Sequence, residues 1–171
     1  MAKVTKKLIE QMVEGRAYDA LLASFDEDPD ATRRFLVRLA YDPQAPLHDE
    51  TIRVLRFLSK ERSAAMPEFF LETMRRQIWA MNEEGGNIAW SAPEIVVAVV
   101  AGNPKRFGDF FSFAFEAAVD EMVFQPSLVK AFDLMAETNP EFVAEYAPKI
   151  EMLRSRLTDS NYLGISPGQS T

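Results

Sequence analysis

The sequence predicts an all-α protein, a short right-handed α-solenoid in which successive pairs of helices stack side by side. Four prolines, each ahead of an apolar-periodic stretch, indicate the period: Pro29, Pro67, Pro104 and Pro140 are 38, 37 and 36 residues apart. Proline suits the first position of a helix, where the missing N–H costs nothing. A period of about 37 residues that holds two helices is typical of a solenoid.

A second set of prolines lies between the first, and each introduces another helix-like stretch. These are Pro46, Pro93 and Pro126. The repeating unit is therefore two helices. The alternative is an irregular helical bundle whose prolines happen to be evenly spaced, because the units share little sequence identity.

Each predicted helix carries apolar residues three or four positions apart. Before the first repeat, residues 3–14 and 16–24 form an N-terminal helical pair split at Gly15. The stripes of the repeat helices are Ala31, Phe35 and Leu39; Ile52, Leu55 and Leu58; Phe70, Met74, Ile78 and Met81; Leu128, Phe132, Met135 and Ala136; and Phe142, Tyr146, Ile150 and Leu153, where Pro148 kinks or splits the helix. The domain predicted is 1–157, with a cap at 1–27, repeats at 28–157 and a flexible tail at 158–171.

The apolar run Ile95 to Val100 resembles a buried strand, but its flanks favour a short, fully buried helix. Ser91 and Glu94 have the spacing of a capping box, in which the serine accepts from the backbone of residue 94 and the glutamate reaches back. Downstream, five phenylalanines between Phe107 and Phe115 predict a helix packed on more than one side. A cofactor pocket is the alternative interpretation of this cluster.

The loop between the helices of the middle unit is the most unusual segment. It carries both tryptophans, Trp79 and Trp90, and two adjacent glycines. As an acidic, aromatic-edged loop it is a candidate site for a cation or a basic peptide. The candidate binding residues are Trp79, Asn82, Glu83, Glu84, Asn87, Trp90 and Glu94. The competing interpretation is that the tryptophans anchor the core and the polar residues cap helix ends.

These residues resemble a segment of HEAT-like (armadillo-like) repeat proteins, and more narrowly of a group of uncharacterised bacterial members. That segment reads Trp, a short spacer, Asn-Glu-Glu, a glycine-rich turn and Trp-x-Ala-Pro-Glu. The matching residues are Trp79, Asn82, Glu83, Glu84, Gly86, Ile88, Trp90, Ala92, Pro93 and Glu94, whereas Gly85, Asn87 and Ala89 depart from it. The resemblance implies an α-solenoid and no established activity.

Charge is distributed unevenly. The net charge is −7, but residues 33–76 carry nine basic and six acidic residues, whereas 77–152 carry four and twelve. Arg53, Arg56 and Lys60 share a helix face and are candidates for a basic binding surface. Polarised ends also suggest stacking between copies of the chain.

Composition excludes several chemistries. Without cysteine there is no disulfide or thiolate metal site, and His48 is the single histidine, interpreted as a surface residue in the first turn of a helix. We expect no metal, no cofactor and no catalytic residues. No apolar run approaches a membrane span, and no secretory signal follows the basic start, so a cytoplasmic location is predicted.

The function predicted is a noncatalytic protein-binding or scaffolding module, because stacked helices offer an extended surface. The first alternative is a small-molecule or metal-binding protein that uses the loop at 79–94. The second is a DNA-binding or DNA-repair protein. The acidic net charge argues against that second alternative, and nucleic acid is not an expected partner.

Overall fold

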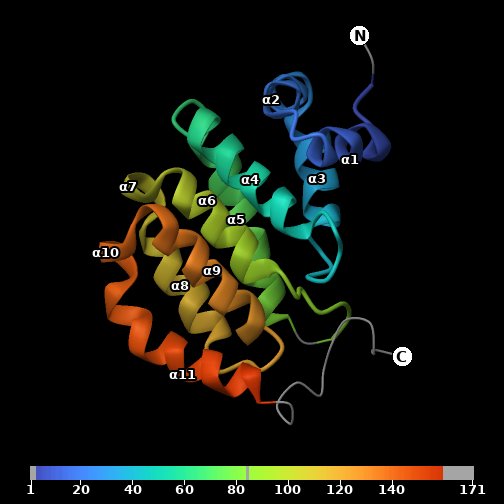
Figure 1. Ribbon diagram of the computed structural model, residues 1–171. Coiled ribbons are helices and arrows are strands. Elements are labelled where there is room, and N and C mark those ends of the chain that lie inside the picture. The colour runs from blue at the N-terminus through green and yellow to red at the C-terminus, as the bar shows by residue number, and fades with distance from the viewer. Residues whose placement is uncertain (1–2, 84, 160–171) are drawn as a thin grey trace.

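The computed structural model describes residues 3–83 and 85–159, and within these ranges the chain is all-α with no strands (Figure 1). The helices are α1 (Lys6–Glu14), α2 (Tyr18–Glu27), α3 (Pro29–Leu39), α4 (His48–Arg62), α5 (Pro67–Asn82), α6 (Ala92–Gly102), α7 (Pro104–Phe107), α8 (Asp109–Ala118), α9 (Gln125–Thr138), α10 (Pro140–Val143) and α11 (Ala147–Thr158), with a 3₁₀ turn, η1 (Ala144–Tyr146), before the last.

The prolines begin helices, as the sequence predicts. Pro29, Pro67, Pro104 and Pro140 are the first residues of α3, α5, α7 and α10. Asp28 and Asn103 also cap two of these starts, because their side chains accept from the backbone N–H three residues on. The closing helix is split just before Pro148, into α10, η1 and α11, also as predicted.

Helix α6 lies at the centre of the molecule. Every residue from Ala92 to Val100 is buried, which confirms the prediction of a fully buried helix. Helices α4, α5, α8 and α9 pack around it (Figure 1). A valine-rich stretch suits this place because it offers apolar surface in every direction and has no polar face to solvate.

Helices α4 and α6 run side by side in the same direction. Near their N termini, His48 of α4 contacts Glu94 of α6, and near their C termini the Ser59 hydroxyl donates to the Val99 carbonyl at 2.7 Å. The helices are closest at Gly102, where an added Cβ would lie 2.6–2.7 Å from three atoms of α4. Two of those three are backbone atoms, so only glycine fits there.

Two expectations need correction. The N-terminal helices begin at Lys6 and Tyr18, each later than predicted, and the second continues to Glu27. The phenylalanine-rich segment is divided at Gly108 into α7 and α8 and is not one helix. Helix α8 packs against α5, α6 and α9, which confirms packing on more than one side, although Phe113 is 49% exposed. The core-facing residues of the segment, Phe107 and Phe111, are each 1% exposed and pack as expected.

In the described part of the chain, no helix combines the length and the apolar character needed to cross a membrane. Of the predicted C-terminal tail, residues 160–171 lie outside the described residues.

Candidate functional site

Three side chains that can ligate a cation converge where α4 and α6 begin. His48 and Asp49 are the first two residues of α4, and Glu94 is the third residue of α6. One ligand atom from each lies within 4.8 Å of the others. Within the described residues this is the one place where three such side chains meet. The parallel packing of α4 and α6 brings together residues that are 46 positions apart in the sequence.

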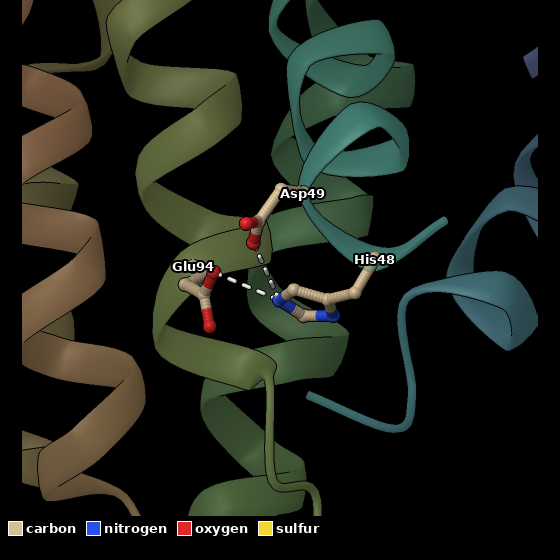
Figure 2. A group of neighbouring side chains, drawn as sticks. All are labelled: His48, Asp49 and Glu94. Atoms are coloured by element: carbon tan, nitrogen blue, oxygen red, sulfur yellow. Dashed lines mark hydrogen bonds and ion pairs between the residues drawn. The ribbon is translucent and has the colours of Figure 1, made fainter. Parts of the chain in front are cut away.

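Asp49 and Glu94 point toward the same ring nitrogen of His48 (Figure 2). The Nε2 atom of His48 lies 2.9 Å from Oε2 of Glu94 and 4.0 Å from Oδ1 of Asp49. The side chains of His48 and Glu94 are 1% and 4% exposed, whereas Asp49 is 73% exposed. A buried pair therefore has one neighbour, Asp49, that faces the solvent.

The opposite ring nitrogen fixes the orientation of His48. Nδ1 lies 3.0 Å from the carbonyl oxygen of Ala40, and because a carbonyl only accepts, Nδ1 carries the proton of this hydrogen bond. In a neutral imidazole Nε2 then presents a lone pair to two carboxylates. Such a cluster of acceptors needs a positive species between its members, either a shared proton or a metal ion. A backbone carbonyl that holds the far nitrogen is the usual support of a metal-bound histidine.

The second oxygen of Glu94 has no partner. Oε1 is buried and makes no hydrogen bond, the one such side-chain atom among the described residues. Glu94 lines a hollow of about 170 Å³, together with Asp49, Lys130 and Glu137. An unpaired buried carboxylate oxygen is costly, so its presence beside a hollow calls for a physical reason.

Lys130 of α9 is the cation now nearest the cluster. Its ammonium donates to Oδ1 of Asp49 at 2.8 Å, and this hydrogen bond, then the charge of Lys130, lowers the pKa of Asp49. Burial opposes that shift. Lys130 is 43% exposed, so this ion pair lies on the solvent side of the cluster.

Two sequence interpretations are wrong here. His48 is a buried residue, not a surface one, because the fold closes α6 over the first turn of α4. Ser91 and Glu94 form no capping box: the Ser91 hydroxyl donates to the Tyr41 carbonyl, and the Glu94 N–H donates to Ser127. Ser91 has φ −106° and ψ 9°, not the extended backbone that a capping residue needs. The Glu94 side chain therefore contacts His48 instead of the backbone of Ser91.

The two tryptophans of the 79–94 loop differ. Trp90 is 6% exposed and belongs to the core, whereas Trp79 is 66% exposed. Asn82 donates to the Ile78 carbonyl of its own helix, which is a helix-end role. Glu83 and Asn87 are exposed, Glu84 lies outside the described residues, and Glu94 faces His48 rather than the loop. The structure therefore does not gather the predicted loop residues around one point.

The predicted basic residues do lie together. Arg53, Arg56 and Lys60 of α4 line one hollow of about 570 Å³. Glu137 of α9 accepts from Arg53 at 3.1 Å and from Arg56 at 3.0 Å. One carboxylate thus already binds two of the three cations, which weakens this surface as a site for an external anion.

Sequence reasoning identified Glu94 but neither His48 nor Asp49 as site residues. The signal available was sequence separation, since side chains of α3 and α5, and of α4 and α6, meet 40 to 46 residues apart. No protein-family model, no curated protein and no solved structure matches this chain.

Proposed function

We propose that this chain is a noncatalytic helical-repeat protein that binds one divalent cation between α4 and α6. The observation that carries the proposal is the convergence of His48 Nε2, Asp49 and Glu94 beside the unpartnered oxygen of Glu94. A cation there neutralises the two carboxylates that face the lone pair of His48 Nε2.

The donor set and spacing suit zinc or manganese. One imidazole nitrogen and two carboxylates are ligands for borderline metals, and the absence of thiolate disfavours copper(I). Ligand atoms of a tetrahedral zinc ion lie about 3.3 Å from one another. The distances of 2.9 and 4.0 Å from His48 Nε2 bracket that value. Water fills the remaining coordination position from the solvent side.

The size of the hollow supports a noncatalytic role. At about 170 Å³ it is smaller than the roughly 300–1,000 Å³ of small-molecule sites. With about 30 Å³ for each water, it holds an ion and a few waters but no organic substrate. The cation then acts as a structural link between neighbouring helices, as bound metals do when they stabilise a folded state.

The test is calorimetric titration of the metal-free protein with zinc, manganese and calcium chlorides. We expect one zinc or manganese equivalent to bind more tightly than calcium, and Glu94→Gln to weaken it at least about 10-fold. The matched control is Glu83→Gln, an exposed acid of the loop, which is expected to bind as the wild type does. Absence of zinc and manganese binding, or a loss in Glu83→Gln instead of Glu94→Gln, overturns the proposal.

Lys130→Met provides a second test, in which cation binding is expected to become tighter instead of weaker. Removal of the competing ammonium from Asp49 frees a ligand and a negative charge, so the variant is expected to bind the cation more tightly than the wild type. A generic loss of folding cannot produce this gain. Weaker binding in Lys130→Met contradicts the assignment of Asp49 as a ligand.

We infer that the helices stack as a short right-handed α-solenoid of HEAT-like pairs. Three hydrogen bonds support this, since each joins residues 40 positions apart: Arg33 with Thr73, Ser59 with Val99 and Ser63 with Asn103. The first joins α3 to α5, the first helices of adjacent pairs, and the second joins α4 to α6, the second helices. An experimental structure in which adjacent pairs are not related by a common rotation contradicts it.

Protein binding is the second candidate function, and the exposed ring of Trp79 favours it. Large aromatic side chains are enriched among the residues that contribute most to protein interfaces. The test is a photo-crosslinking amino acid at position 79 in the native cell, with position 75, one turn earlier and also exposed, as the control. One specific adduct from position 79 supports this function, and equal labelling from both positions argues against it.

A further inference from the structure

A second hollow, between α3 and α5, is lined by four arginines: Arg33, Arg34, Arg38 and Arg76. Its volume is about 410 Å³, within the range of small-molecule sites. Asp30 is the one carboxylate in its lining. This hollow is separate from the cation site, which lies between α4 and α6.

Arg33 forms the rigid floor of this hollow. Its side chain is 9% exposed, and its guanidinium donates to Asp30 at 2.9 Å and to Thr73 at 3.1 Å. The same group lies 4.2 Å above the ring of Phe69. These contacts fix the direction in which the guanidinium points, so a ligand that binds it loses little conformational entropy.

Positive charges outnumber negative charges around Arg33. Burial first, and then repulsion by Arg76, lowers the pKa of Arg33, while Asp30 and Glu72 oppose the shift. Glu72 is shared, because it lies 3.9 Å from Arg33 and 2.6 Å from Arg76. Four guanidinium groups thus face two carboxylates, an excess of two positive charges.

Arg34 and Arg38 are unpaired. Among the described residues neither has an ion pair with a carboxylate, and the two are one turn apart, so they share a face of α3. Arg34 lies over the ring of Phe35, 4.9 Å from its centroid. Glu72 pairs with Arg33 and Arg76 here as Glu137 pairs with Arg53 and Arg56 on α4, so Arg34 and Arg38 are the cations that distinguish this hollow.

We propose that this hollow binds the diphosphate group of a small phosphorylated ligand. A guanidinium presents two parallel N–H groups that match phosphate oxygens. A diphosphate carries more negative charge and more acceptor oxygens than a single carboxylate, so it reaches more guanidinium groups at a time. The ligand sits between Arg38 of α3 and Arg76 of α5, with Arg33 beneath it.

The test is titration with pyrophosphate, at low salt and in the presence of a chelator that removes divalent cations. The variants are Arg38→Gln and Arg76→Gln, whose exposed side chains do not support the core. Each is expected to bind pyrophosphate about 10-fold or more weakly, the loss that corresponds to one charge-assisted hydrogen bond. Arg75→Gln is the matched control, since Arg75 is exposed on the same helix but does not line the hollow. This variant is expected to match the wild type.

Further titrations distinguish a nucleotide from free pyrophosphate as the molecule that carries the diphosphate group. Binding of adenosine diphosphate at least as tight as that of pyrophosphate assigns the site to a nucleotide, and tighter binding of pyrophosphate assigns it to the free ion. The proposal is overturned if pyrophosphate does not bind, if Arg75→Gln loses as much as Arg76→Gln, or if duplex DNA or phosphoinositide vesicles bind this surface while pyrophosphate does not.

Discussion

The His48–Glu94 pair makes a sharp prediction about stability, tested by a double-mutant cycle with leucine. In metal-free protein, His48→Leu leaves the Glu94 carboxylate buried without any partner, since Oε1 already has none. An unpaired buried charge costs about 3–5 kcal/mol, and the Ala40 carbonyl loses its hydrogen bond as well. We therefore expect this variant to lose about 4 kcal/mol of unfolding free energy.

The other variants of the cycle cost less. Glu94→Leu leaves a neutral imidazole nitrogen unpaired, which costs about 2 kcal/mol. The double variant leaves only the Ala40 carbonyl without its side-chain partner and fills the space with apolar groups, so it is expected to lose about 1–2 kcal/mol. The sum of the single losses is about 6 kcal/mol, which makes the coupling energy roughly 4 kcal/mol.

The assay is urea denaturation in the presence of a chelator, with Asp49→Asn as a control. Asp49 is 73% exposed and pairs with Lys130 at the surface, so its loss is expected to cost less than about 1 kcal/mol. Additivity of the two leucine variants within about 0.5 kcal/mol refutes the reasoning. A double variant less stable than both single variants also refutes it, because the pair would then stabilise the fold by itself.

Three further predictions concern other parts of the molecule. Gly102→Ala gains up to about 1 kcal/mol of helix propensity but places a methyl group 2.6–2.7 Å from α4, so we expect a net loss of about 1–2 kcal/mol by urea denaturation, and a gain contradicts the close packing. Burial, and then the hydrogen bond to Glu50, raises the pKa of Tyr18 from 10.0 to about 12. The protonated phenol therefore stabilises the fold fully below pH 10, and this contribution is lost as the pH rises toward 12; denaturation across that interval should show no such decline in Tyr18→Phe. Trp90→Ala is expected to cost about 3–5 kcal/mol and Trp79→Ala less than about 0.5 kcal/mol, so thermal denaturation that shows similar losses for both is inconsistent with their burial.

The helix starts marked by proline were predictable because they are local, unlike the bounds of α1 and α2. A proline fixes its own φ and removes its own N–H, so its place at the start of a helix does not depend on the rest of the fold. The start of α3 at Pro29 and the split before Pro148 follow from this. Burial of the valine-rich stretch in α6 was also predictable, since a helix with no polar face is stable only when other helices cover it on all sides.

The site was not predictable from local patterns. His48 and Asp49 read as an ordinary polar first turn, and the burial of one and exposure of the other depend on α6, 46 residues away. Ser91 and Glu94 had the spacing of a capping box, but neighbouring segments provide their partners instead. Where local and distant partners compete for one polar group, spacing alone does not decide between them.

The polar contacts between α3 and α5 and between α4 and α6 differ in whether all their buried polar atoms have partners. Ser59 joins α4 to α6, and Asn103 joins the residues just after these helices by donating to Ser63, each through one hydrogen bond. Arg33 joins α3 to α5 through Thr73, with its charge matched by Asp30. His48 and Glu94 also link adjacent helices, but at the cost of a buried carboxylate oxygen without a partner in the described chain. Apolar side chains would join α4 to α6 without the free-energy cost of burying a carboxylate. This incomplete pair, beside a hollow that Asp49 and Glu94 both line, is the feature that supports the proposed cation site.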